Sequence, residues 1–264
     1  MELTQEIVEK YIKEIILSSR EAGAAIMEIY NQEDLGIQRK SDESPLTKAD
    51  LAANKILCDT LKRISPEIPI ISEENESISY MDRAGWEYCW IVDPLDGTKE
   101  FIKRNGEFTT NVALVKGDAA VAGVIYAPAL DEMYWGIYGN GAYSEIKGEV
   151  VKMQVSTYSK SDKNLKLVCS RSHLNEATQA IVNEFDTPEL VASGSSLKFM
   201  KIAKGDAHLY PRMAPTMEWD TCAAQAILEE AGGFVLQADS EEAVIYNKEN
   251  LLNPSFIALA NQVD

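Results

Sequence analysis

The densest group of oxygen-bearing residues in the chain is the run Asp93-Pro94-Leu95-Asp96-Gly97-Thr98, which follows the apolar segment Trp90-Ile91-Val92. A carboxylate at the end of a strand emerges at the edge of its sheet, and a turn through the proline and the glycine returns the second carboxylate to the same side. The Leu95 carbonyl and the Thr98 hydroxyl add two oxygens. Because hard cations such as Mg²⁺ bind oxygen ligands and water, the run predicts a divalent metal site. Asp-Pro and Asp-Gly pairs also occur in simple tight turns, which is the alternative interpretation.

Three further acidic positions are candidates for the same site, and each also has an ordinary structural explanation. Glu73 and Glu74 follow a short apolar segment, where a solvated acidic pair is common. Asp220 opens an alanine-rich helix, a position at which aspartate often serves as the N-cap. Thr47 and Asp50 have the spacing of a capping box. Several carboxylates converging on one point repel strongly at low dielectric, so a shared site requires bound cations.

A second group of residues is suited to binding an anion. The turn Gly194-Ser195-Ser196 precedes a short predicted helix that carries Lys198. Backbone N–H groups and hydroxyls at such a turn can hold a phosphate, although plain helix capping by Ser195 is equally compatible with the pattern. Arg212 follows a predicted strand, where a lone arginine is more often a solvated surface residue.

The predicted elements that position these residues fall into two halves that meet near residue 158. In the first half, apolar residues at spacings of three and four predict helices over 5–30 and 47–63. Strands are predicted over 68–72, 90–93, 109–115, 119–126 and 133–138. We expect an α+β domain over 1–158, in which the two helices cover an antiparallel meander that carries most of the metal ligands.

The second half alternates between strands and helices. Strands are predicted over 165–170, 190–192, 207–210, 234–237 and 255–259, and helices over 175–184, 195–204 and 218–231. Alternation of this kind indicates an α/β arrangement of layers. We expect an α/β domain over 159–264 that carries the substrate-binding residues and Asp220.

The overall charge narrows the classes of function. The 264 residues carry a formal net charge of −17, which disfavours non-specific binding to nucleic acid or to anionic membranes. An anionic substrate would be repelled at long range, so phosphate chemistry requires bound cations or local basic groups. The two histidines exclude a histidine-rich metal site, and the four well-separated cysteines indicate buried thiols in a reducing compartment.

The N-terminal segment and the hydropathy pattern bear on location. The first ten residues are amphipathic and acidic, unlike a signal peptide, and no apolar run is long enough to span a membrane. We expect a cytoplasmic protein, with peripheral association at the inner membrane face left open.

The motif at residues 90–98, together with Trp219-Asp220 before an alanine-rich helix, resembles the inositol monophosphatase superfamily of Mg²⁺-dependent, lithium-sensitive phosphatases. The likeness is stronger to its CysQ-type 3′(2′),5′-bisphosphate nucleotidase branch. The segments that carry this second likeness are 44–50, 93–111, 170–173, 194–199 and 209–212. The resemblance covers nearly the whole chain, from about residue 22 to about residue 257.

The resemblance implies a fold, a reaction and a set of cofactors. The implied fold is a five-layer αβαβα sandwich of the α/β (α+β) class. The implied reaction is hydrolysis of the 3′-phosphate of adenosine 3′,5′-bisphosphate to AMP and phosphate, a step of sulfur metabolism. Two or three Mg²⁺ ions per active site would activate a water molecule and neutralise the phosphoryl oxygens. The sequence contains no G-x-S-x-G nucleophile elbow, which would support a covalent serine mechanism, and it contains no P-loop.

The resemblance also assigns roles to individual positions. Asp50 and Thr98 would orient the nucleophilic water. The implied metal ligands are Glu73, Asp93, the Leu95 carbonyl, Asp96 and Asp220. The implied substrate-binding residues are Gly97, Thr98, His173, Gly194, Ser195, Ser196, Lys198, Arg212 and Asp220, with Lys198 and Arg212 on the second phosphate and His173 near the ribose or base. Asn75 departs from the family pattern, which often has an acid there, and we expect little effect.

Two rival functions remain at this stage. An inositol monophosphatase, or another small sugar-phosphate phosphatase, would share the metal ligands without needing the features around Lys198 and Arg212. A non-catalytic phosphate- or metal-binding regulator would not need Asp50 and Thr98, which serve water activation. The expected partner is a small nucleotide bisphosphate, and monomer and homodimer remain open.

Overall fold

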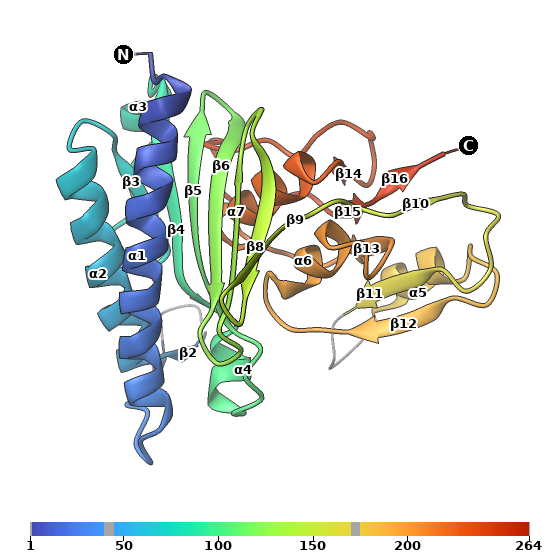
Figure 1. Ribbon diagram of the computed structural model, residues 1–264, viewed down its shortest axis with the longest axis horizontal. Coiled ribbons are helices and arrows are strands. Elements are labelled where there is room, and N and C mark those ends of the chain that lie inside the picture. Colours follow the sequence, from blue (N-terminus) through green and yellow to red (C-terminus); the bar gives the residue numbers. More distant parts are fainter. Residues whose placement is uncertain (1, 40–44, 170–174, 264) are drawn as a thin grey trace.

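Two long helices near the N-terminus form the outermost layer of the structure, a computed structural model that describes residues 2–39, 45–169 and 175–263 (Figure 1). Helix α1 (Gln5–Tyr30) buries one apolar stripe, which includes Ile12, Ile15 and Ile26. Helix α2 (Lys48–Ile64) starts at the N-cap Thr47 with a complete capping box. The helical periodicity therefore predicts both helices correctly to within a residue.

A seven-stranded sheet lies against these helices. Its strands follow in space the order in the chain, which is β3 (Ile70–Ser72), β4 (Tyr88–Asp96), β5 (Thr109–Lys116), β6 (Ala119–Ala127), β7 (Glu132–Ile137), β8 (Gly141–Ile146) and β9 (Glu149–Lys152). β4 to β9 form the predicted antiparallel meander, while β3 pairs parallel to β4. The prediction missed β8 and β9, of which β9 is exposed along its whole length and therefore has no buried apolar face.

A five-stranded sheet is built from the second half of the chain. Its spatial order is β12 (Glu189–Ala192), β11 (Lys166–Cys169), β13 (Leu209–Arg212), β15 (Phe256–Leu259) and β14 (Phe234–Gln237). β11 runs parallel to β12 and β13, and β15 runs antiparallel to both of its neighbours. The predicted alternation of strands and helices is confirmed.

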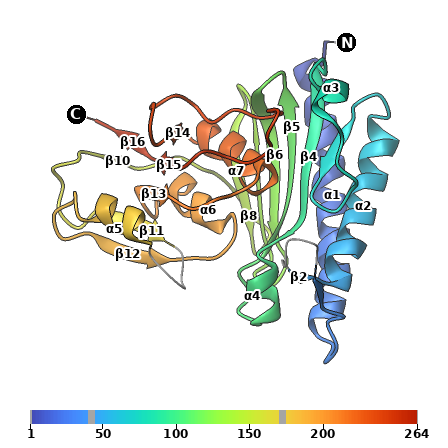
Figure 2. The ribbon, with the colours of Figure 1, turned by 180° about the vertical axis from the view of Figure 1, so that it is seen from behind.

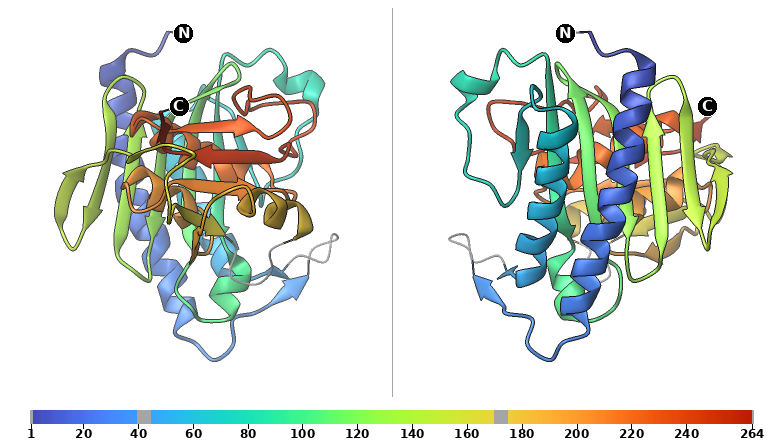
Figure 3. Two further views of the ribbon diagram at one scale, coloured as in Figure 1. Left: turned by 90° about the vertical axis from the view of Figure 1, so that its right-hand side faces the viewer. Right: turned by 60° about the vertical axis from the view of Figure 1, so that its left-hand side comes forward.

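Helices separate and cover the two sheets (Figures 1 and 2). α6 (Leu197–Ala203) and α7 (Glu218–Glu230) lie between the sheets. α5 (Glu176–Val182) lies on the outer face of the five-stranded sheet, as the left view of Figure 3 shows. The layers therefore form the expected αβαβα sandwich. The remaining short elements are β1 (Gln38–Arg39), β2 (Pro45–Leu46), α3 (Tyr80–Arg83), α4 (Thr98–Ile102), β10 (Thr157–Tyr158) and β16 (Asn261–Gln262). Within the described ranges, no helix is both long and apolar enough to cross a membrane.

The alternation of side chains along β4 decides which way its terminal carboxylate points. Trp90 and Val92 pack into the core under α1 and α2, whereas Cys89 and Ile91 face the core shared with α6 and α7. Successive side chains of a strand point to opposite faces. Asp93 therefore continues the second set and faces α7.

Helix α7 packs unusually close to the seven-stranded sheet because two glycines face it. Gly123 and Gly136 are directly paired on β6 and β7. A Cβ atom at Gly123 would lie 2.3 Å from the carbonyl oxygen of Ala223, and one at Gly136 would lie 2.9 Å from the Cα of Ile227. The helix backbone thus rests directly on the sheet, which brings its first turn close to the end of β4.

We predict that Gly123→Ala destabilises the protein, because the added methyl group forces α7 away from the sheet. Overpacking of this kind costs about 1–3 kcal/mol of folding free energy, which would appear as a lower thermal unfolding midpoint. Gly85→Ala is the matched control, since a Cβ at Gly85 meets no atom within 4 Å. Equal midpoints for the two variants would contradict the close packing.

Candidate metal-dependent active site

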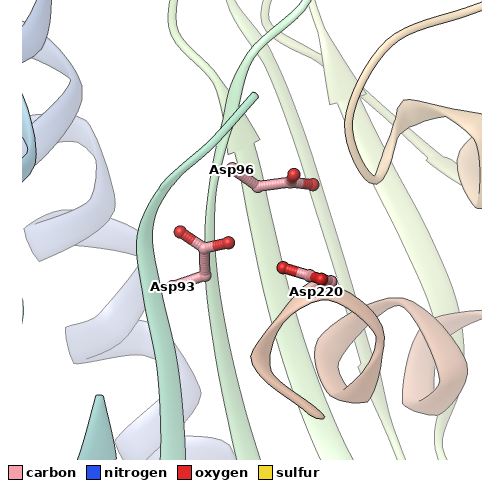
Figure 4. A group of neighbouring side chains, drawn as sticks. All are labelled: Asp93, Asp96 and Asp220. Atoms are coloured by element: carbon pink, nitrogen blue, oxygen red, sulfur yellow. The ribbon is translucent and has the colours of Figure 1, made fainter. Parts of the chain in front are cut away.

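Three carboxylates from two distant parts of the chain converge beside the end of β4. Ligand atoms of Asp93, Asp96 and Asp220 all lie within 4.8 Å of one another. Figure 4 shows the two β4 carboxylates facing the first turn of α7, from which the third approaches. Side-chain oxygens this close, on residues with little solvent access, form a donor set suited to a hard divalent cation.

An irregularity in β4 brings its two aspartates to one side. The pairing of β4 with β5 shifts register between Asp93 and Asp96, as in a β-bulge. The Leu95 N–H donates to Asp93 Oδ1 (3.0 Å), which closes the turn around the first carboxylate. Gly97 follows with φ = +91°, a conformation that favours glycine, and α4 starts immediately after it.

Asp220 is held by the start of its own helix. It is the third residue of α7, and its Oδ2 accepts a hydrogen bond from the backbone N–H of Met217 (2.8 Å). The N-cap is Met217, so the interpretation of Asp220 as the N-cap residue is wrong. One carboxylate oxygen satisfies the helix terminus, and the other remains for the space shared with Asp93 and Asp96.

The electrostatics of the cluster favour a bound cation. Burial raises the pKa of Asp93 well above its usual range, and the charges of Glu73, Asp96 and Asp220 raise it further. Burial, followed by the charge of Asp96, raises the pKa of Asp220 to about 7. The protein alone therefore disfavours full ionisation of this cluster, and a divalent cation would reverse that preference.

Asp50 and Thr98, the expected water-orienting pair, lie together. Asp50 Oδ2 accepts hydrogen bonds from the Thr47 N–H (2.7 Å) and hydroxyl (2.5 Å), so the capping box is real. Its Oδ1 lies 3.3 Å from the Thr98 hydroxyl, which is also 3.3 Å from the Leu95 carbonyl oxygen. Burial raises the pKa of Asp50. The capping and catalytic interpretations are thus compatible, because each uses a different carboxylate oxygen.

Glu73 lies on the turn after β3, beside the cluster. Its N–H donates to the Val92 carbonyl (3.2 Å), and its charge raises the pKa values of Asp93, Asp50 and Asp220. It is not a member of the tight group found among the described residues. Its role as a ligand stays a prediction.

The side chain of Asn75, the residue that departs from the family pattern, holds the same turn. Asn75 Oδ1 accepts a hydrogen bond from Asn54 (3.0 Å), and Asn54 Oδ1 in turn accepts one from the Ser72 hydroxyl (2.7 Å). These contacts tie the turn to α2, one helical turn beyond Asp50.

A cavity of about 100 Å³ opens beside the carboxylates and joins them to the basic residues. Its lining includes Asp96, Asp220, Ser195, Lys198 and Arg212. Ser195 Oγ and Arg212 Nε are buried without a hydrogen-bond partner in the protein. Unsatisfied polar atoms at a cavity wall indicate a missing ligand or water, and their chemistry suits an anion.

Lys198 is held rigidly in the same wall. Its Nζ donates to the Ser195 carbonyl (2.6 Å) and lies 5.4 Å from the ring centroid of Tyr210. Burial lowers its pKa, and the charge of Asp96 opposes that effect. The lysine is fixed in place and is not a solvated surface residue.

The segment before α6 differs in detail from the prediction. α6 starts at Leu197 with Ser196 as N-cap, so helix capping by Ser195 is wrong, and Ser195 instead has φ = +43°. The Ser196 hydroxyl does not cap the helix either, since it donates to Asp96 Oδ2 (2.8 Å). Gly194 leaves no room for a side chain, because a Cβ there would lie 2.8 Å from the Glu107 carbonyl oxygen. His173 lies outside the described residues.

Sequence reasoning missed two buried residues at the site. Thr109 and Asn111 lie on β5, directly opposite Asp96 and Asp93 in the strand pairing. Asn111 Nδ2 donates to the Ser196 hydroxyl (2.9 Å), and the Thr109 hydroxyl donates to Asn111 Oδ1 (2.9 Å). The available signal was the run of three polar residues, Thr109-Thr110-Asn111, that opens a strand whose next four residues are apolar.

We predict that Asp220→Asn stabilises the metal-free protein at about pH 8. A raised folded-state pKa makes the wild type most stable below the unfolded value of about 4, and this stability is lost as the pH rises toward about 7. The amide lacks that titration and can still accept from Met217. In EDTA, the variant should have the higher unfolding midpoint at about pH 8, with a smaller difference at about pH 5.

Asp239→Asn, on an exposed side chain, is the control. An Asp220→Asn protein with the pH dependence of the wild type would contradict the argument.

The chain is similar over nearly its whole length to proteins of known family. The model of the inositol monophosphatase family matches residues 8–262. The 3′(2′),5′-bisphosphate nucleotidase CysQ of Salmonella typhimurium is 39% identical over 93% of this chain and 98% of that protein. The nucleotidase of the same name from Buchnera aphidicola is 44% identical over 86% of this chain and 84% of that protein.

A solved structure agrees with both the sequence similarity and the fold. The crystal structure of CysQ from Bacteroides thetaiotaomicron, described as a bacterial member of the inositol monophosphatase family, has a TM-score of 0.83 to this structure. It is 41% identical in sequence, and the match covers 95% of this chain and 97% of that one. The layers, the carboxylate cluster and these similarities together show that the chain belongs to the inositol monophosphatase family.

Proposed function

We propose that this protein is a Mg²⁺-dependent phosphatase that hydrolyses the 3′-phosphate of adenosine 3′,5′-bisphosphate to AMP and phosphate. The observation that carries the proposal is that Asp96 and Asp220 line the same cavity as Lys198 and Arg212. A doubly phosphorylated substrate requires a cavity of this kind, because one phosphate must reach bound metal ions while basic side chains at the other end of the cavity hold the second phosphate. The similarity to proteins named 3′(2′),5′-bisphosphate nucleotidase supports the choice of nucleotide.

The proposed metal ligands are Asp93, Asp96 and Asp220, with Glu73 and the Leu95 carbonyl beside them. A Mg²⁺ site usually takes only one or two carboxylates and keeps several waters. Four carboxylates therefore suit two or three ions better than one. When bound, Mg²⁺ would neutralise the cluster, lower the pKa of a coordinated water and stabilise the charge on the phosphoryl oxygens.

The residues next to the cluster are placed to manage the proton of the attacking water. Thr98 Oγ1 lies between Asp50 Oδ1 and the Leu95 carbonyl, so it can accept a proton from water while passing its own to Asp50. The raised pKa of Asp50 makes it a better base for this task. As the water oxygen bonds to phosphorus, the bond to the ribose 3′ oxygen breaks, the leaving oxygen takes up a proton from solvent, and Asp50 later returns its proton to solvent.

The basic end of the cavity would hold the phosphate that remains on the product. Arg212 Nε and Ser195 Oγ are buried donors without protein partners, and Lys198 adds a fixed positive charge. Held there, the 5′-phosphate would orient the nucleotide with its 3′-phosphate toward the carboxylates. Gly97 and Gly194 let the backbone beside Asp96 and Ser195 pass close to the Glu107 carbonyl oxygen, because a Cβ would lie 3.1 Å from that oxygen at Gly97 and 2.8 Å from it at Gly194.

We predict that phosphate release from adenosine 3′,5′-bisphosphate is lost in EDTA and restored by Mg²⁺. Ca²⁺ should inhibit, because it prefers longer bonds and more ligands than an octahedral Mg²⁺ site offers. Asp93→Asn should lose nearly all turnover while its thermal midpoint in EDTA is not reduced. Full wild-type activity in excess EDTA would overturn the metal-dependent mechanism.

We predict that Lys198→Ala and Arg212→Ala each lower kcat/KM for adenosine 3′,5′-bisphosphate by on the order of 10–100-fold, the worth of a charge-assisted hydrogen bond. The loss should fall mainly on KM, because contacts to the retained phosphate change little in the transition state. Adenosine 3′-monophosphate should show a much smaller loss. Lys201→Ala is the control, since Lys201 lies on the same helix but does not line this cavity. Equal losses on both substrates would instead favour a general sugar-phosphate phosphatase.

A further inference from the structure

Three polar side chains form a chain of hydrogen bonds that ends on the carboxylate of Asp96. The Thr109 hydroxyl donates to Asn111 Oδ1 (2.9 Å), Asn111 Nδ2 donates to Ser196 Oγ (2.9 Å), and Ser196 Oγ donates to Asp96 Oδ2 (2.8 Å). Thr109, Asn111 and Ser196 are each at most 1% exposed. The chain is therefore shielded from water, which would otherwise supply alternative partners.

The direction of these hydrogen bonds is determined by the donors available. Because Asn111 Oδ1 accepts from Thr109, its amide nitrogen must face Ser196 and also lies 3.5 Å from Asp96 Oδ2. The reversed amide would place its oxygen against the carboxylate instead. With Ser196 Oγ accepting from Asn111, its single proton is left for Asp96, or for the Asp220 carbonyl 3.1 Å away. One hydroxyl thus touches two of the three residues of the carboxylate cluster.

We propose that Thr109, Asn111 and Ser196 are positioning residues that hold Asp96 in the orientation needed for metal binding, and that Ser195 alone of the two adjacent serines contacts the substrate. The inference rests on the proposed function, in which Asp96 is a metal ligand. Ser196 Oγ is already engaged with Asp96, whereas Ser195 Oγ is buried at the cavity wall without a partner. The two serines therefore have different roles.

The place of Asp96 in the fold explains why it needs the hydrogen-bond chain Thr109–Asn111–Ser196, here called the relay. Asp96 follows the bulge of β4, where the regular pairing is interrupted, and it is half-buried while the rest of the strand is buried. Engaging Oδ2 leaves Oδ1 as the oxygen directed to the metal. Loss of a partner behind a metal ligand typically costs on the order of 10–100-fold in metal affinity.

The test uses β5 itself, which offers a matched pair of buried threonines. Thr109→Val removes the first donor of the relay at nearly constant volume, and Thr109→Ser keeps the hydroxyl. Thr110→Val makes the same change on the opposite face of the strand, where Thr110 Oγ1 has no partner. Mn²⁺, which prefers the same oxygen ligands, is titrated into the metal-free proteins without substrate, and the free ion is followed by electron paramagnetic resonance.

We expect Thr109→Val to weaken Mn²⁺ binding by about 10-fold, while Thr109→Ser and Thr110→Val bind as the wild type does. Ser196→Ala should weaken Mn²⁺ binding at least as much, and it provides the test if Thr109→Val does not fold. Ser195→Ala should leave Mn²⁺ binding unchanged and raise KM for adenosine 3′,5′-bisphosphate.

Two different failures can be told apart. If the wild type binds Mn²⁺ and hydrolyses the nucleotide, but Thr109→Val and Ser196→Ala bind Mn²⁺ as tightly as Thr110→Val, the relay has no positioning role and the proposed function stands. If the wild type neither binds Mn²⁺ nor releases phosphate, the proposed function falls, and the inference falls with it.

Discussion

The mutual repulsion of the carboxylates at the end of β4 is the constraint on which the rest of the site depends. Asp93, Asp96 and Asp220 are brought within 4.8 Å of one another, and burial raises the pKa of two of them. Such a cluster opposes folding unless cations or protons compensate it. The fold brings Asp220 toward Asp93 and Asp96 because Gly123 and Gly136 let α7 pack directly on the seven-stranded sheet. The packing of α7 against the sheet thus stabilises an arrangement that electrostatics alone would separate.

Hydrogen bonds within the protein orient the carboxylates of the site, including Asp50, in a consistent way. Asp93, Asp96 and Asp220 each use one oxygen for a hydrogen bond within the protein and leave the other for the shared space, whereas the second oxygen of Asp50 faces the Thr98 hydroxyl. The tethered oxygens and their donors are Asp50 Oδ2 with Thr47, Asp93 Oδ1 with Leu95 N–H, Asp96 Oδ2 with Ser196, and Asp220 Oδ2 with Met217 N–H. Two of the tethers, those of Asp50 and Asp220, bond to the N-cap backbone N–H of a helix, so a helix start and a functional carboxylate are the same structural feature.

The sequence predicts the long helices and the positions of the carboxylates well. It predicts less well the neighbouring side chains that hold those carboxylates in place. Helical periodicity defines α1 and α2, and the density of oxygen donors singles out Asp93 and Asp96, because these signals are local. The link between Asn111 and Ser196 spans 85 residues and joins two ordinary polar side chains, so only the fold reveals it. The start of α6 was misplaced for a related reason. Ser195 adopts a positive φ that serine rarely takes, and tertiary contacts override its capping preference.

The most direct test of the account is to locate bound ions at the site. Crystals grown with Mn²⁺ and inorganic phosphate should show anomalous scattering peaks among Asp93, Asp96 and Asp220, at about 2.0–2.4 Å from their carboxylate oxygens. The Asp96 oxygen nearest a peak should be Oδ1, with Oδ2 still bonded to Ser196. Well-diffracting crystals with Mn²⁺ present but no peak within this cluster would contradict the claim that the three carboxylates converge to hold metal.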